Sequence, residues 1–248
     1  MSKIHGVNLG NWLVLEKWMH PALFEGVAAE DETDLCRLLP RDELLARLKK
    51  HRDTYVTLED FKWIKAHGLD TVRIPVPHFI FGDAPAFCDP YVPCIEYLDK
   101  AFDWAEETGL KILIDLHTAP DSQNGFDNGG ICGVCKFWQK PENEARVIKV
   151  LGMLSARYAD RPALFGVQIL NEPISPELWK HIEGRYPPAD PEYAAGSGPV
   201  PFEFLCSFYK KAYKEIRRYL GEDKVVMFHD GFRLKMWKEF MQTEEFKN

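Results

Sequence analysis

The sequence lacks the features that are typical of membrane proteins, of secreted proteins and of nucleic-acid-binding proteins. No apolar run is long enough to span a bilayer, and the start, Met-Ser-Lys-Ile-His-Gly, has no apolar signal segment. We therefore expect a cytoplasmic protein with no membrane partner and with its 6 cysteines mostly reduced. Lys and Arg number 31 against 38 Asp and Glu, a net charge of −7. This balance argues against a nucleic-acid partner.

Glycine-rich nucleotide motifs are missing as well. Neither a dinucleotide fingerprint nor a phosphate-binding loop follows the first strand-like segment, which disfavours open-sheet nucleotide binders, and we expect no cofactor. Repeats, low-complexity tracts and clear linkers are also lacking. The 248 residues are 46% hydrophobic and 28% charged, which is typical of a folded globular chain. We predict a single domain over residues 1–248.

Short apolar runs alternate with amphipathic stretches along the chain. Several runs are continuously apolar or β-branched, which is typical of parallel strands that are buried on both faces. The predicted strands are Ile4–Leu9, Thr71–Pro77, Lys111–Leu116, Leu164–Asn171 and Lys224–His229. Between the predicted strands, apolar residues recur at the spacing of amphipathic helices. Thr57 is a plausible N-cap and Gly109 a plausible end of such helices. A repeated βα pattern predicts either a barrel or an open doubly wound sheet.

Three connections are long, and all of them follow strands: 19–55, 121–141 and 187–201. The third is rich in Pro and Gly, but it falls between a strand and its helix, so we interpret it as a βα loop and not as a domain boundary. In barrels, the loops after the strands build the active site. The sequence therefore predicts an elaborated functional face.

Polar residues gather at the predicted strand ends. Arg73 lies within an apolar strand, His117 ends the next strand, and Asn171 and Glu172 end a third. Taken singly, Arg73 could form a structural ion pair and His117 could be a satisfied core histidine. Their joint placement at successive strand ends favours a catalytic site, because the carboxyl ends of barrel strands carry the chemistry.

Six segments, which cover nearly the whole chain in the correct order, resemble glycoside hydrolase family five and in particular its exo-β-1,3-glucanase branch. SQNGFDN is the most branch-specific of these motifs. The segments are GVNLGNWLVLEKWMHPALFE from Gly6, TLEDFKWIKAHGLDTVRIPVP from Thr57, DPYVPCIEYLDKAFDWAEETGLKILIDLH from Asp89, SQNGFDNGG from Ser122, GVQILNEP from Gly166 and VVMFHDGF from Val225.

This resemblance implies a (β/α)8 TIM barrel, of which about the first five βα units are present, and retaining hydrolysis of β-glucosidic bonds. It implies that Glu172 is the acid/base and that Asn171 holds the sugar 2-hydroxyl. Arg73 would lie against the nucleophile, and His117 would hydrogen-bond at the cleaved sugar. These roles fit the chemistry, since a poor leaving group needs a proton from a carboxylic acid that is held neutral.

The resemblance also implies a substrate site at the strand ends. Glu16 and Asp127 would grip the outer hydroxyls of the terminal glucose, and Phe126 and Phe232 would line the entrance. From the residues alone, Glu16 could be a solvated surface charge and Asp127 could serve only to form a turn. The expected partner is a β-glucan oligosaccharide or a β-glucoside.

The cysteines depart from the family pattern. Cys132 and Cys135 form a CxxC, and Cys88 and Cys94 lie in the preceding βα loop. Because neighbouring βα loops lie side by side on a barrel rim, these four thiolates could converge on a structural zinc ion. Four ordinary reduced thiols are the favoured alternative, so we predict no metal.

The family's nucleophile is a glutamate at the end of the seventh strand, which we expect beyond Asn248. The leading hypothesis is exo-acting hydrolysis of β-1,3-glucan ends or small β-glucosides. A related alternative is an endo-acting or β-1,6-directed glucanase, which the loop 174–200, with Trp179 and Tyr186, would decide. A different class remains open too: a non-catalytic carbohydrate-binding or scaffold derivative that lacks the nucleophile.

Overall fold

The computed structural model describes residues 3–82, 89–182 and 184–242. Five parallel strands form one sheet in the order β1-β2-β3-β4-β5. Their bounds are β1 (Gly6–Asn8), β2 (Thr71–Val76), β3 (Lys111–Leu116), β4 (Leu164–Gln168) and β5 (Val225–Met227). All five predicted strands are confirmed, although the fourth ends at Gln168 and leaves Asn171 and Glu172 in the segment that follows it.

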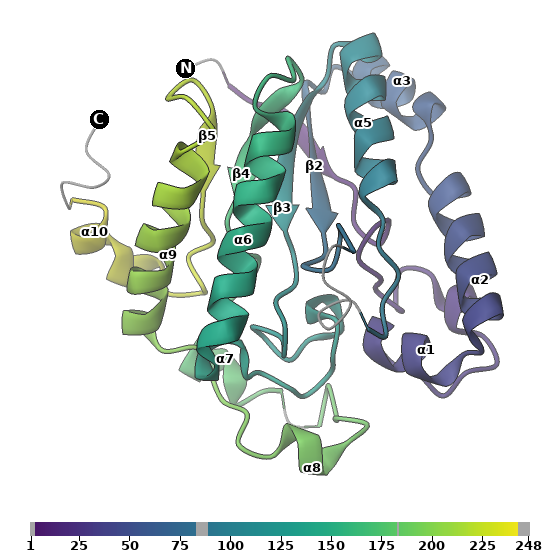
Figure 1. Cartoon of the computed structure of the whole chain (residues 1–248), viewed down its shortest axis with the longest axis vertical. Coiled ribbons are helices and arrows are strands. Elements are labelled where there is room, and N and C mark those ends of the chain that lie inside the picture. Colours follow the sequence, from purple (N-terminus) through teal and green to yellow (C-terminus); the bar gives the residue numbers. More distant parts are fainter. Residues whose placement is uncertain (1–2, 83–88, 183, 243–248) are drawn as a thin grey trace.

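Helices join consecutive strands, so that α5, α6 and α9 lie side by side across one face of the sheet (Figure 1). The α-helices are α1 (Glu32–Leu38), α2 (Arg41–Thr54), α3 (Leu58–Ala66), α5 (Ile95–Thr108), α6 (Pro141–Tyr158), α7 (Pro176–Trp179), α8 (Pro191–Ala194), α9 (Phe202–Arg217) and α10 (Trp237–Phe240). Four short 3-10 helices are η1 (Pro21–Phe24), η2 (Asp127–Gly129), η3 (Phe137–Gln139) and η4 (Leu234–Met236). None of the described helices combines the length and the apolar composition that a membrane crossing needs.

The predicted helix signals are confirmed. Thr57 and Asp60 form a reciprocal capping box at the start of α3. Gly109 ends α5 with a φ of 73°, a left-handed conformation that costs glycine little because it has no Cβ. The connection 19–55 is more structured than the sequence analysis expected, since it contains α1 and α2.

Two buried clusters hold these layers together. The larger cluster lies between the sheet and its helices and contains strand residues such as Ile74, Ile114 and Val167. The smaller cluster lies beneath the loop after β1, where Leu15 packs with residues of α1 and α2 such as Leu35 and Leu48. The loop that carries Glu16 therefore rests on a core of its own.

The sheet and its helices form the consecutive βα units of a partial (β/α) barrel. Every βα connection emerges at the same end of the sheet, because all strands are parallel. This end is the lower one in Figure 1, where α1, α7 and α8 lie beyond the arrowheads of β2 and β3. The long connections thus meet at the face where barrel enzymes place their active sites.

Candidate active site

One guanidinium group ties four neighbouring strands together at this face. Arg73, on β2, donates from Nε to Gln168 on β4 over 3.0 Å and from Nη1 to Asn8 on β1 over 2.8 Å. Its Nη2 lies 2.9 Å from Asp115 Oδ2 on β3 and donates to Asn171 Oδ1 over 2.9 Å. This side chain organises the strand ends from β1 to β4.

Asp115 links the arginine to the histidine. It is fully buried, and its Oδ2 also contacts Nδ1 of His117. Nε2 of His117 in turn lies 3.3 Å from Nδ2 of Asn171. An amide nitrogen can only donate, so Nε2 accepts and the ring proton resides on Nδ1, facing the carboxylate.

The structure therefore brings Arg73, His117 and Asn171 together, as the sequence predicted. The residue that joins them, Asp115, was not identified from the sequence. Asp115 stands between Ile114 and Leu116 in a strand whose other residues after Lys111 are all apolar. A charge at such a position was the signal that could have identified it. The structural interpretation of Arg73 and the catalytic one are also compatible, since the ion pair is part of the cluster.

Replacing Asp115 by asparagine is expected to lower the free energy of unfolding by roughly 2–4 kcal/mol, because the partly buried Arg73 guanidinium loses its counter-charge. Urea unfolding would measure this change. Asp103→Asn is the matched control: Asp103 also pairs with an arginine, Arg161, but its side chain is 71% exposed. Exposed pairs contribute about 1 kcal/mol or less. Equal losses in the two variants would contradict a buried, organising role for Asp115.

Glu172 follows β4 in an unusual backbone conformation. Its φ is +45°, in the left-handed region that residues with a side chain rarely adopt. The neighbouring Asn171 is fixed on both sides, since its N–H donates to Leu116 O and its carbonyl accepts from Gln123 Nε2. The backbone is thus held in place on the β3 side of the turn that presents the Glu172 carboxyl.

Asn128 contacts that carboxyl directly. Its Nδ2 donates to Glu172 Oε2 over 3.0 Å, and its Oδ1 accepts from Asn124 Nδ2 over 2.9 Å. Both asparagines belong to the loop after β3, where no Cβ could be added at Gly129 without coming within 2.2 Å of Asn124 Oδ1. Sequence reasoning assigned no contact to Asn128, although it lies in the most branch-specific motif.

His229, which follows β5, completes the described surroundings. Burial lowers the pKa of His229, and the carboxylates of Glu172 and Asp230 offset part of that shift. The ring of Phe232 lies edge-on to His229, with 5.2 Å between the ring centroids, and is 41% exposed. Phe232 therefore lies beside this site, on the β5 side.

Glu16 is held by its own loop. Its N–H donates to Asn11 Oδ1 over 2.7 Å, and its Oε2 accepts from the Trp18 indole N–H over 3.1 Å. The residue before it, Leu15, donates its N–H to the buried Glu32. Glu16 is only 9% exposed, which does not fit a freely solvated surface charge.

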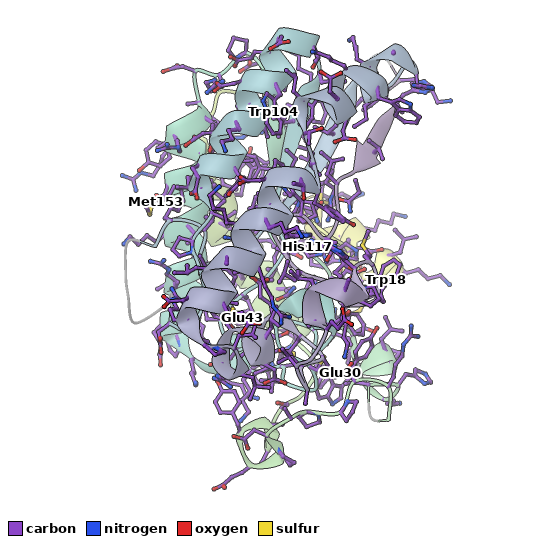
Figure 2. All side chains as sticks on the ribbon, turned by 90° about the vertical axis from the view of Figure 1, so that its right-hand side faces the viewer. Trp18, Glu30, Glu43, Trp104, His117 and Met153 are labelled. Atoms are coloured by element: carbon purple, nitrogen blue, oxygen red, sulfur yellow. The ribbon has the colours of Figure 1, made fainter. Side chains whose placement is uncertain are left out.

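Asp127 lies within electrostatic reach of Glu16. Burial, followed by the charge of Glu16, raises the pKa of Asp127 to about 6. Next to it in sequence, Phe126 packs against Tyr186, with ring centroids 5.3 Å apart. The carboxyl groups of Asp127 and Glu16 thus form a pair. Figure 2 shows Trp18 and Glu30 on the side of the molecule away from Trp104.

The cysteines do not form the suggested metal site. Cys88 lies outside the described residues, and no group of three or more potential ligands that could hold a metal occurs in the part of the chain that the structure describes. Cys94 and Cys135 are fully buried in the larger core, where burial raises the pKa of the Cys94 thiol to about 12. The alternative of a zinc site is not supported for Cys94, Cys132 and Cys135, which are buried thiols.

Comparisons with known proteins agree with this arrangement. The family model "Cellulase (glycosyl hydrolase family 5)" matches residues 47–229. A probable glucan 1,3-beta-glucosidase A of Aspergillus niger is 36% identical over 96% of this chain and 52% of its own length. The protein of the same description from Aspergillus fumigatus is 41% identical over 98% of this chain and 53% of its own length.

The chain thus spans about half the length of the curated relatives that it matches. Among solved structures, a rutinosidase from Aspergillus niger superimposes with a TM-score of 0.79. It is 21% identical, and the match covers 96% of this chain and 65% of that one. At this identity the likeness shows the fold, a (β/α) barrel.

Proposed function

The chain belongs to glycosyl hydrolase family 5, and on that premise we propose that it supplies the acid/base half of a retaining β-glucosidase. The proposed substrates are the ends of β-1,3-glucans or small β-glucosides. The observation that carries the proposal is the single guanidinium of Arg73, bound by side chains of β1, β3 and β4 beside Asn171 and Glu172.

In the proposed reaction, Glu172 protonates the departing glycosidic oxygen and later activates water as a base. Asn171 is positioned by Arg73 and His117, so its amide can hold the sugar 2-hydroxyl in a fixed orientation. Such a bond strengthens as the ring approaches the oxocarbenium-like transition state. Asn128 orients the Glu172 carboxyl through its own hydrogen bond.

Arg73 has one further role in the proposal. A guanidinium carries five N–H donors, and the second Nη1 hydrogen has no partner among the described residues. We assign that hydrogen to the nucleophile, a carboxylate contributed from beyond residue 248. A cation at this position keeps the nucleophile ionised.

Asp127 and Glu16 are proposed to bind outer hydroxyls of the terminal glucose. Replacing Asp127 by asparagine should then weaken binding of glucose or gluconolactone by about 1–3 kcal/mol, because charged hydrogen bonds are lost. Calorimetric titration would measure this change. An unchanged affinity would return Asp127 to a turn-forming role.

The same substitution, which should weaken binding, should raise the free energy of unfolding at neutral pH. With a pKa of about 6 in the folded chain against an ordinary value of 3.8, the carboxyl holds its proton longer when folded. Stability therefore falls as the pH rises from about 4 to about 6, by an amount on the order of 2 kcal/mol. Asp127→Asn should remove this fall. The variant should therefore have a higher free energy of unfolding than the wild type at pH 7 but not at pH 4. Urea unfolding at both pH values is the measurement, and a gain that is equal at the two values would contradict it.

A further inference from the structure

The residues that begin α1 contact both of the loops that carry Glu16 and Asp127. Asp31 is the N-cap of α1, and Glu32 and Thr33 are the first two residues of the helix. All three are buried, with no more than 1% of any of them exposed. A buried polar side chain needs hydrogen-bond partners, because an unpaired one costs free energy. The partners here include backbone groups of the two loops.

Glu32 holds the backbone next to Glu16. Its Oε2 accepts the N–H of Leu15, the residue before Glu16, over 3.1 Å. Its Oε1 lies 3.9 Å from a guanidinium nitrogen of Arg52 on α2, and both side chains are at most 2% exposed. Asn11 holds the next peptide group, since its Oδ1 accepts the Glu16 N–H. The backbone that carries the Glu16 carboxyl is therefore fixed at two successive N–H groups.

Thr33 holds η2, the turn that carries Asp127. Its N–H donates to Gly130 O over 3.1 Å, and its hydroxyl donates to the same oxygen. The Gly130 N–H in turn donates to Asp127 O over 2.9 Å. Because the Thr33 hydroxyl has a single hydrogen, it accepts at its 2.7 Å contact with the Tyr91 hydroxyl, in the loop after β2. Thr33 thus joins the turn to a third loop.

Asp31 adds a second contact to the loop after β3. Its Oδ2 accepts the Cys132 N–H over 2.6 Å, while its Oδ1 caps α1 by accepting the Asp34 N–H over 2.9 Å. Three consecutive residues are thus bonded to Leu15 on one side and to Gly130 and Cys132 on the other. Residues of one helical turn have fixed relative positions, so the two loops that they bind keep a constant separation.

The carboxyl groups of Glu16 and Asp127 oppose this arrangement. The charge of Glu16 contributes to the raised pKa of Asp127, so the two groups repel one another when both are ionised. Loops that carry like charges side by side need contacts elsewhere to keep them at one separation. The residues that begin α1 supply such contacts to both loops.

We propose that Asp31, Glu32 and Thr33 are positioning residues, which hold Glu16 and Asp127 at the separation that the hydroxyls of a terminal glucose require. The inference rests on the proposed function and assigns the geometry of its sugar recognition to the start of α1. The three residues act through the two carboxyl groups, because their own polar groups are buried and bonded to other groups of the protein. The expected signature is a loss of sugar affinity without a loss of the chemical step.

The test uses the polypeptide with the complete barrel, and Thr33→Val is the first variant. It keeps the size of the side chain but removes the hydroxyl, so Gly130 O loses a donor. Calorimetry should show glucose or gluconolactone binding weakened by about fivefold, the effect of one lost hydrogen bond. For p-nitrophenyl β-glucoside, KM should rise by a similar factor with kcat within about twofold, because uniform binding is lost. Thr33→Ser, which retains the hydroxyl, should behave like the wild type.

Tyr91→Phe tests the same contact from the other side, since it removes the hydroxyl that donates to Thr33 and leaves the bond to Gly130 O intact. It should also weaken sugar binding, by about twofold to fivefold. Thr108→Val is the matched control, because the Thr108 hydroxyl also donates to a backbone carbonyl, that of Trp104, but lies on α5. It should leave the affinity unchanged. Unchanged affinity in both Thr33→Val and Tyr91→Phe would overturn the inference.

A double-mutant cycle separates positioning from a general loosening of the structure. Asp127→Ala removes one of the groups that are positioned. In that background, Thr33→Val should change glucose affinity by less than about twofold, because coupled residues give non-additive effects. A fivefold loss in both backgrounds would show that Thr33 acts independently of Asp127 and would overturn the inference.

The binding measurements need no turnover, so they separate this inference from the proposed function. Sugar binding with the expected cycle but without hydrolysis of p-nitrophenyl β-glucoside would support the positioning role and reject the proposed hydrolysis. Hydrolysis with a glucose affinity that Asp127→Ala leaves unchanged would overturn the positioning role. The acid/base assignment of Glu172 would then stand alone.

Discussion

Glu172→Gln, in the polypeptide with the complete barrel, is expected to lower kcat/KM for laminaribiose by about 10²–10⁴-fold, the usual contribution of a general acid. The amide cannot supply a proton to the departing sugar oxygen. It keeps the size of the side chain and can still accept the hydrogen bond from Asn128, so the geometry of the turn should persist. Steady-state hydrolysis of laminaribiose, followed by glucose release, is the measurement.

Two comparisons make this result specific. Aryl β-glucosides with good leaving groups need little protonation, so their glycosylation step should be affected far less. Glu177→Gln is the matched control, because Glu177 is an exposed glutamate of the same segment, on α7. It should behave like the wild type. Laminaribiose turnover by Glu172→Gln at the wild-type rate would remove Glu172 from the acid/base role.

Residues 1–248 expressed by themselves are expected to show no turnover of aryl β-glucosides or laminarin. Retention of configuration requires two carboxyl groups about 5–5.5 Å apart, one as acid/base and one as nucleophile. In the described part of the chain, the printed contact of the Glu172 carboxyl is with an amide, that of Asn128, and not with another carboxyl group. We therefore expect the described residues to provide no nucleophile for Glu172 to act with.

The edges of the sheet support the same expectation. In the described part of the chain, β1 pairs with β2 alone and β5 with β4 alone. Val7 and Met227 on these edge strands are 37% and 38% exposed. Unpaired edges with apolar side chains favour association between chains, which barrel closure removes.

Size-exclusion chromatography and the two activity assays, with a polypeptide that carries a complete barrel as the positive control, test this expectation together. Association or poor solubility without turnover is the predicted outcome for residues 1–248. A soluble monomer with ordinary glycosidase turnover would contradict it. The search for the nucleophile would then return to this sequence.

The sequence by itself determined the order of the elements and most of the candidate site. Continuous apolar runs of strand length are distinctive because parallel strands are buried on both faces. Caps such as Thr57 and Gly109 are local, so short segments specify them without the rest of the chain. Arg73 and His117 could also be recognised from the local sequence, because each is a polar residue within or at the end of an apolar strand.

Only the tertiary structure decided which of these groups touch. Asp115 could be recognised as the link between Arg73 and His117 only once β2 and β3 were paired in register. Asn128 meets Glu172 across 44 residues, and one cavity is lined by residues of the loops after β1, β3 and β4, such as Trp18, Asp127 and Arg185. The CxxC spacing of Cys132 and Cys135 is compatible with a zinc site, but the structure buries both thiols, and no group of three or more potential ligands that could hold a metal occurs among the described residues. Contacts of this kind depend on how segments distant in sequence pack together. The spacing of residues along one strand or loop does not determine that packing.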